Sequence, residues 1–338
     1  MRLSWDNIDE RLYRDGVDHG VLYVLREYGY DIGVSWNGIT GIDDSSSGRE
    51  TTNLYTNDIR SKVLKTKPER GGTIKCFTYP PEFEECIGGD EIYPGLVLYD
   101  QEETAFGVTY RSHIGNASEG IDYAEMIHIF YGLNVTSASQ NLATIGSEVD
   151  PEELSFSFTS IPEPMTEHSP VSLLTFRSDR VLDMQWERLE NTLYGTNESE
   201  PTLPYPDDLM KILEVVAIHG EVIWDDDDDA DGLRPDHLLI SLYKEVNETT
   251  TLVDRIEVSA ADNWQYSFDP QFRFEGDEEI TFSVTGVYGQ ELIAETDENL
   301  VSEGPVFKFV TEEYWPCRYD ETIDGFVLTE TRADDPLE

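Results

Sequence analysis

The pentapeptide LSFSF at residues 154–158 alternates apolar and polar side chains strictly. In an extended strand successive side chains point to opposite faces, so its leucine and both phenylalanines would share one face. The same alternation occurs in IHIFY at residues 127–131 and in TIKCFTY at residues 73–79. This period predicts strands with one buried face and indicates a mainly β protein.

One segment changes to helical spacing. In SDRVLDMQWERLENTLYG, residues 178–195, apolar side chains recur every three or four positions, at Leu182, Trp186, Leu189 and Leu193. The spacing predicts one packing helix, whose start Ser178 or Asp179 would cap and whose end Gly195 would mark.

The following residues predict a boundary and a second domain. TNESEPTLPYPDD, residues 196–208, is rich in proline and polar residues, so residues 201–215 are interpreted as a linker, with a short helix at 207–214. Short strands separated by turn signals then predict a β-sandwich over residues 216–311. These strands are expected at residues 238–243, 253–260, 263–268, 279–284 and 306–310. The domains are therefore 1–200 and 216–311, followed by a C-terminal tail at 312–338.

The charge of the chain is extreme. Its 338 residues carry 70 acidic and 23 basic side chains, a net charge of -47, yet 38% of residues are hydrophobic, so the chain is expected to fold. Only seven residues are lysine. An acidic, lysine-poor surface is typical of proteins from concentrated salt, where the Debye length falls to roughly 3 Å. Because concentrated salt alone can account for the acidic charge, the charge identifies no basic partner. Binding of nucleic acid by the general surface is disfavoured in either case.

Targeting signals and cysteine pairs are not evident. No stretch approaches 18 consecutive apolar residues and the N-terminal residues have no apolar core, so we expect synthesis in the cytoplasm and no membrane insertion. Cys76, Cys86 and Cys317 have no C-x-x-C spacing. Buried thiols are favoured over a disulfide or a metal site.

An aspartate-rich stretch, VIWDDDDDADGLRPDH at residues 222–237, resembles the first half of a calcium loop. The twelfth loop position, which requires a bidentate glutamate, is Leu238. An acidic turn between two strands is therefore the preferred interpretation, and Asp227, Asp229 and Asp231 remain candidates for a weaker ion site.

Catalytic motifs are absent from the sequence. There is no G-x-S-x-G, no H-E-x-x-H and no glycine-rich phosphate loop, and the six histidines are scattered. We expect no enzymatic activity and no cofactor. The alternative is a hydrolase built on a pair of carboxylates, which 70 acidic residues would conceal.

One basic segment departs from the acidic background. RSKVLKTKPERGGTIK, residues 60–75, contains six of the 23 basic residues in 16 positions. A solvated hairpin is one interpretation. The other, which we favour, is a docking segment for an acidic surface on another copy of the chain. Its residues would be Arg60, Lys62, Lys65, Lys67 and Arg70.

Six motifs in order resemble one viral family. They are GVDHGVLYV (16–24), GVSWNGITGID (33–43), TNLYTNDIR (52–60), GGTIKCFTYPPEFEECIGG (71–89), FGVTYRSHIGN (106–116) and HIFYG (128–132). Together they resemble the major tail protein, the tail-tube subunit, of long-tailed siphoviruses, over residues 10–196. The resemblance implies a tail-tube β-sandwich with one packing helix. It also implies hexameric rings that stack into a tube conducting DNA, with a loop at residues 43–72 reaching the next ring.

The second half resembles the Cna protein B-type domain. The shared order is Trp224, Asp231-Gly232, Arg234-Pro235, Asn263-Trp264 and Tyr266, within residues 216–311. The resemblance implies an immunoglobulin-like or prealbumin-like β-sandwich on the outside of the tube. Members often carry a lysine to asparagine isopeptide bond, but Gly286 stands where its glutamate would fall and no lysine lies near Trp224. We therefore expect no such bond.

Three functions follow from these observations. The first is a structural virion protein, assembled in the host cytoplasm of a haloarchaeal or other halophilic organism into the tail tube. Its partners would be its own copies, other tail proteins at the tube ends, and viral DNA passing without specific binding. The second is a surface-binding, adhesin-like module that recognises host glycan or S-layer. The third is a calcium-dependent or hydrolytic enzyme.

Overall fold

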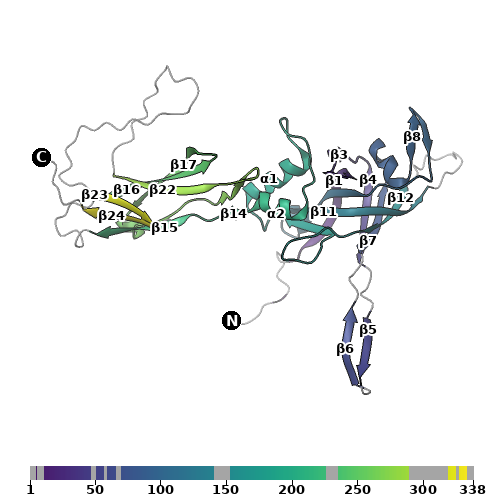
Figure 1. The fold of residues 1–338 in the computed structure, drawn as a ribbon, viewed down its shortest axis with the longest axis horizontal. Coiled ribbons are helices and arrows are strands. Elements are labelled where there is room, and N and C mark those ends of the chain that lie inside the picture. Colours follow the sequence, from purple (N-terminus) through teal and green to yellow (C-terminus); the bar gives the residue numbers. More distant parts are fainter. Residues whose placement is uncertain are drawn as a thin grey trace. The chain divides into compact units, whose positions relative to one another are not determined.

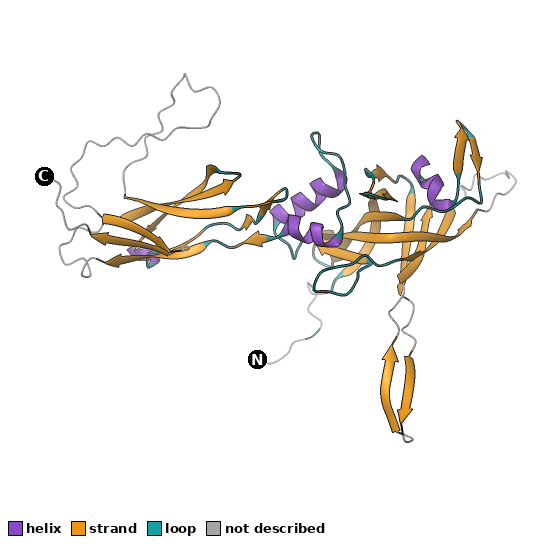
Figure 2. Ribbon diagram, in the orientation of Figure 1, coloured by secondary structure: helices purple, strands orange, loops and turns teal. Residues whose placement is uncertain are grey.

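The computed structural model divides the chain into two compact units, Met1–Leu213 and Glu214–Glu338 (Figure 1). It describes residues 5, 11–46, 51–56, 59–65, 70–140, 153–225, 235–288, 319–324 and 327–332. Strands predominate in both units, with few helices (Figure 2). The predicted mainly β class is therefore confirmed. No helix in these ranges is long and apolar enough to span a membrane.

A nine-stranded sheet forms the first unit, in the order β2-β1-β10-β11-β12-β7-β4, with β3 paired to β1 and β13 paired to β11. The pairings between these strands are antiparallel. The strands are β1 (Tyr13–Arg26), β2 (Gly29–Tyr30), β3 (Val34–Ser35), β4 (Ile39–Ser46), β7 (Arg70–Cys76), β10 (Phe106–Asn116), β11 (Gly120–Ser139), β12 (Leu154–Ser160) and β13 (Leu173–Arg177).

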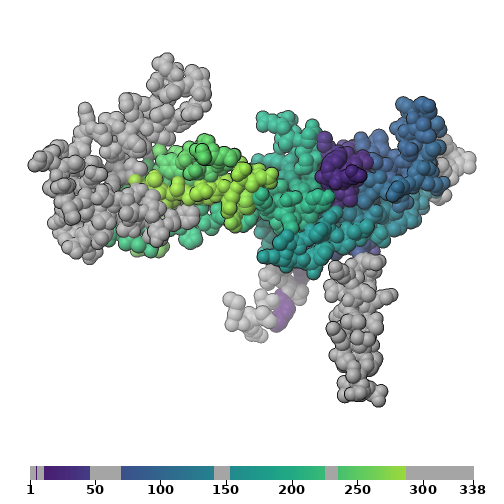
Figure 3. Space-filling model, viewed as in Figure 1, coloured from purple at the N-terminus to yellow at the C-terminus, as the bar shows by residue number. Residues whose placement is uncertain are grey.

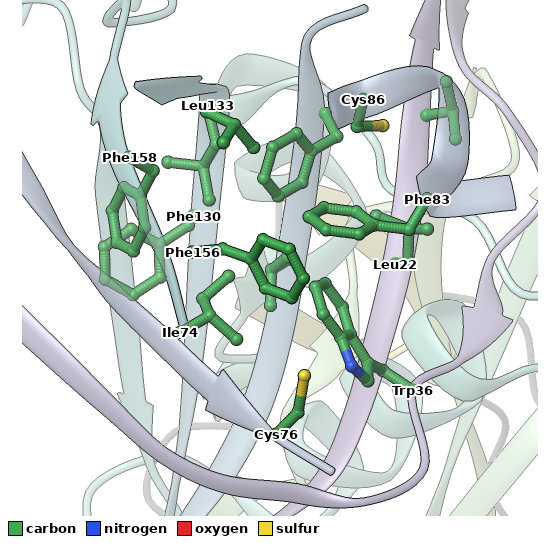
Figure 4. Close-up of a cluster of buried hydrophobic side chains, with 14 of the residues drawn as sticks. Leu22, Trp36, Ile74, Cys76, Phe83, Cys86, Phe130, Leu133, Phe156 and Phe158 are labelled. Carbon is green, nitrogen blue, oxygen red and sulfur yellow. The ribbon is translucent and has the colours of Figure 1, made fainter. Parts of the chain in front are cut away.

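One face of this sheet encloses an aromatic core. Phe156 and Phe158 of the LSFSF motif are buried in it, as the alternation predicts. The 3-10 helix η2 (Pro81–Ile87) adds Phe83, whose ring centroid lies 4.5 Å from that of Trp36 and 5.0 Å from that of Phe156 (Figure 4). Cys76 and Cys86 are free, buried thiols of this core, as predicted, and Cys317 lies outside the described residues.

Two helices cover the other face. Helices α1 (Asp183–Tyr194) and α2 (Pro206–Leu213) bury leucine side chains against this face. The side chains of β1 and β11 that they contact are those pointing away from the aromatic core. The buried residues of this second core are Val21, Tyr23, Ile127, Ile129, Tyr131, Leu189, Leu193, Leu203, Leu209 and Leu213. The predicted linker at residues 201–215 therefore contributes buried leucines to the first unit, and the division between units falls at its end.

The predicted start of the long helix is wrong by about one turn. Ser178 and Asp179 were expected to cap it, but the Ser178 hydroxyl accepts a hydrogen bond from the Glu125 amide and Asp179 binds Arg177. The helix begins at Asp183. The Gln185 side chain there accepts a hydrogen bond from the Leu182 amide at 3.2 Å. Ser178, which the sequence predicts as the N-cap, instead binds Glu125 of β11 through its hydroxyl.

Two separate hairpins interrupt the sheet order. The first, β5 (Thr51–Thr56) and β6 (Ile59–Lys65), lies in the chain between β4 and β7, which pair with each other. The second, β8 (Asp90–Tyr93) and β9 (Leu96–Leu98), follows β7 and η2. Each hairpin pairs only within itself among the described strands.

The second unit is a β-sandwich. One sheet has the order β18-β15-β24-β23 and the other β17-β16-β22, with two short ladders, β14-β19 and β20-β21. Their bounds are β14 (Val215–Val216), β15 (His219–Asp225), β16 (His237–Val246), β17 (Thr249–Ser259), β18 (Gln265–Ser267), β19 (Gln271–Phe272), β20 (Phe274–Glu275), β21 (Glu278–Glu279), β22 (Thr281–Tyr288), β23 (Tyr319–Asp324) and β24 (Val327–Arg332). A three-residue 3-10 helix, η3 (Ala260–Asp262), follows β17.

Side chains of both sheets share one core in this unit. Val222 of β15 and Ile240 of β16 lie in the same buried cluster, so the two sheets pack face to face. Four of the five strands expected here are present as β16, β17, β18 and β22, and residues 306–310 lie outside the described residues. The buried members of the core are Ile218, Val222, Leu238, Ile240, Leu242, Val258, Trp264, Tyr266, Phe268 and Val284.

The C-terminal residues join this sandwich. Strand β24 pairs with β15 in parallel, from Val222 opposite Leu328 to Asp225 opposite Thr331, and β23 pairs with β24. The predicted C-terminal tail at residues 312–338 therefore contains two strands that extend the first sheet of the second unit.

Candidate assembly site

The predicted docking segment lies on the β5–β6 hairpin and at its base. Arg60, Lys62 and Lys65 belong to β6, where they stand opposite Tyr55, Leu54 and Thr51 of β5. Lys67 lies outside the described residues, and Arg70 begins β7. The structure thus places three of the five predicted residues on one strand of an inserted hairpin.

The base of the hairpin is held by ion pairs within the subunit. Arg70 binds the Asp44 carboxylate of the neighbouring strand β4, and the Lys75 ammonium lies 3.3 Å from the Asp43 carboxylate. Arg70 therefore already has a partner in its own subunit.

Sequence reasoning missed an apolar surface on the β8–β9 hairpin. Its five large side chains are exposed by 43–67%, although the chain around them is acidic. We define the apolar hairpin surface as Ile92, Tyr93, Leu96, Leu98 and Tyr99. In the space-filling view the hairpin lies at the molecular surface (Figure 3). Large exposed apolar side chains gathered on one hairpin make it a candidate interaction site.

The turn of this hairpin explains why it forms. Gly95 has φ +84, a left-handed conformation that glycine adopts without a steric cost, and Pro94 precedes it. The Gly95 amide donates to Glu91 Oε1 at 2.7 Å. The sequence YPGL was therefore a readable turn signal, but it does not reveal that both flanking strands are exposed.

Helix η2 attaches this hairpin to the enclosed core. Phe83 and Cys86 are fully buried, and the Arg26 guanidinium donates two hydrogen bonds of 2.6 Å to Glu85. The Tyr99 hydroxyl donates to Glu84 Oε1 at 2.5 Å, and this hydrogen bond raises the pKa of Tyr99. The apolar hairpin surface is therefore presented by an element that is itself anchored.

Exposed carboxylates accompany the apolar hairpin surface along the chain. The chain contains no lysine, arginine or histidine between Lys75 and Arg111. We define the acidic rim as the exposed carboxylates of this stretch, Glu82, Asp90, Glu91, Asp100, Glu102 and Glu103. Exposed apolar and charged side chains together are the composition of a protein interface, which has an apolar core and a polar rim.

A second polar cluster centres on Arg111 of β10. Its Nε lies 2.9 Å from Asp18 Oδ1 and its Nη1 lies 3.0 Å from Glu125 Oε2. Asp18 also contacts His19 at 2.9 Å and His113 at 3.0 Å. The histidines expected to be scattered are thus partly brought together, because β1 and β10 are paired neighbours.

The backbone of β1 positions Asp18 in this cluster. The register with β10 shifts on both sides of Asp18, and His19 has φ +49. Such bulges reorient a side chain in a sheet. Burial raises the pKa of the Asp18 carboxyl, but hydrogen bonds with Arg111, His19 and His113 outweigh it, and the pKa lies well below its usual value. The cluster ties β1, β10 and β11 together.

His128 of β11 forms a different polar pair. Its Nε2 lies 2.9 Å from the Ser112 hydroxyl, and its ring stacks on Tyr110 with centroids 4.4 Å apart. Burial, with a smaller effect of Arg14, lowers the pKa of His128 to about 4. The imidazole is therefore neutral at pH 7.

The metal candidates Asp227, Asp229 and Asp231 lie outside the described residues. Within the described ranges no group of three histidine, cysteine, aspartate or glutamate side chains is arranged to hold a metal ion.

Comparison with known proteins finds relatives of the second unit. Residues 218–301 match the Cna protein B-type domain. The collagen adhesin of Staphylococcus aureus is 29% identical over 100 residues, which are 30% of this chain and 7% of that protein. The chain therefore spans a small part of this relative's length. The Cna B-type β-sandwich predicted for the second half is confirmed.

Two solved structures are also similar. One is a single B repeat unit of the collagen binding surface protein of Staphylococcus aureus, 21% identical with a TM-score of 0.25, covering 35% of this chain and 47% of that chain. The other is a chain of an extracellular contractile injection system, the PVC sheath-tube complex in its extended state. It is 12% identical with a TM-score of 0.25, covering 47% of this chain and 88% of that chain.

Proposed function

We propose that this chain is the structural subunit of a viral tail tube, forming hexameric rings that stack and conduct DNA. The observation that carries the proposal is the β5–β6 hairpin, inserted between the paired strands β4 and β7. It bears Arg60, Lys62 and Lys65 in a chain of net charge -47. The order of six tail-tube motifs over residues 10–196 supports the same assignment.

The chain would act without catalysis or a cofactor. Its partners would be its own copies, tail proteins at the tube ends, and DNA in transit. A net negative subunit disfavours adhesion of the passing phosphate backbone. The tube would assemble in the cytoplasm of a halophilic host and remain in the virion tail.

Reversing the hairpin charges tests this role. In Lys62→Glu/Lys65→Glu, we expect folded subunits that no longer stack, because the charges that meet an acidic neighbour have changed sign. Sedimentation velocity in molar salt measures the loss of large assemblies. The matched control is Arg180→Glu/Lys211→Glu, which makes the same change in net charge outside the hairpin. Normal assembly of the hairpin variant would contradict the docking role.

A second candidate function is a surface-binding, adhesin-like module. The match of residues 218–301 to the Cna B-type domain, and the similarity to a collagen adhesin, favour it. Under this alternative the second unit would bind host glycan or S-layer, and the first unit would serve as its anchor. Binding of the full chain to host envelopes without any self-assembly would favour it over the tube.

A further inference from the structure

We propose that the apolar hairpin surface of β8–β9, with its acidic rim, receives the β5–β6 hairpin of the next copy along the tube. This inference rests on the proposed function, because it names the surface that the docking hairpin contacts. The occupant is a second copy of this chain.

The topology places the two hairpins at opposite ends of one strand. Residue Arg70 of β7 pairs with Ser46 of β4, and the β5–β6 hairpin connects these two ends. The other end of β7, Cys76, leads through η2 into β8–β9. The two ends of β7, six steps of about 3.3 Å apart, are separated by roughly 20 Å.

Opposite ends suit a head-to-tail contact. When one copy is placed beyond another along β7, the β5–β6 end of the first faces the β8–β9 end of the second. A contact between two different surfaces that does not close on itself generates an open stack. Each copy then offers one donor hairpin and one acceptor surface.

The two surfaces are complementary in charge. The donor strand β6 bears Arg60, Lys62 and Lys65, whereas the acidic rim has six exposed carboxylates. The chain from residue 76 to residue 110 has no basic residue at all. This surface therefore offers carboxylates without neighbouring cations from its own segment.

The apolar hairpin surface would keep the contact stable in concentrated salt. At about 1 M salt the Debye length is roughly 3 Å, so rim charges alone bind weakly. Burial of Tyr93 and Leu96, exposed by 67% and 51%, is not weakened by this screening. Because Phe83 anchors η2, which leads into the hairpin, binding costs the hairpin little conformational entropy.

Zero-length cross-linking tests the inference. Full-length chains, half of them labelled with 15N, are assembled in molar salt and treated with a carbodiimide, which joins amines to carboxylates in contact. We expect mixed-label peptides that join Lys62 or Lys65 to the acidic rim. If tubes form and these lysines cross-link only to carboxylates outside residues 82–103, the inference is overturned.

Surface variants provide the second measurement. Tyr93→Ser/Leu96→Ser should abolish stacking while single rings and the folded subunit remain, because both side chains are exposed. The matched control, Ile223→Ser/Leu252→Ser, alters exposed side chains of the second unit and should stack normally. Normal stacking of the first variant would overturn the inference.

Charge exchange gives a third result. On its own, Glu102→Lys/Glu103→Lys should block stacking. In a chain that also carries Lys62→Glu/Lys65→Glu, stacking should be restored. If wild-type chains form no rings or tubes, the proposed function fails and this inference with it. If they stack and the exchange restores nothing, only the acceptor assignment fails.

Discussion

At the scale of single residues, partly buried polar groups hold the sheet of the first unit together. Arg111 is 16% exposed and bridges Asp18 of β1 to Glu125 of β11. His128 lies on the opposite face of β11 and pairs with Ser112. Both clusters join residues of different strands, so their geometry depends on register and could not be read from spacing.

His128 gives the first unit a pH dependence. Its folded pKa of about 4 lies below the usual value of about 6.5, so between these values the unfolded chain binds a proton that the folded chain does not. Stability is therefore lost as the pH falls from about 6.5 to about 4. In His128→Gln we expect a smaller fall in melting temperature between pH 7.5 and pH 4.5 than in the wild type. His168→Gln, at an exposed position, is the control and should behave like the wild type.

At the scale of elements, the alternation of apolar and polar residues predicted the strands well, but it did not predict which strands expose apolar side chains. The strands at residues 73–79, 127–131 and 154–158 lie within or overlap β7, β11 and β12. The start of α1 was wrong because Ser178 contacts Glu125 in the folded chain. The apolar hairpin surface was not predicted, because apolar side chains in a short strand are ordinarily expected to be buried.

The attachment of β8–β9 depends on Phe83. Phe83→Ala should destabilise the first unit by roughly 3–5 kcal/mol, because it leaves a cavity among Trp36, Phe106 and Phe156. Tyr99→Phe removes only the hydrogen bond to Glu84 and should cost about 1 kcal/mol or less. Denaturant unfolding in molar salt measures both. Equal effects of the two substitutions would contradict the anchoring role of η2.

At the scale of the whole molecule, we expect a net charge of -47 to make folding depend on salt. Below about 0.5 M salt the Debye length lengthens toward 4–10 Å, and repulsion between carboxylates increases. We expect the chain to unfold on dilution and to refold when salt is restored. Fluorescence of its six tryptophans follows this transition. Full stability in dilute buffer would refute the halophilic interpretation.

Copies of this chain are proposed to assemble into a tube. Negative-stain electron microscopy of the purified full-length protein in molar salt tests it most directly. We expect rings of six copies and stacked tubes with a continuous lumen. A strictly monomeric protein at high concentration, without rings or polymers, would contradict it.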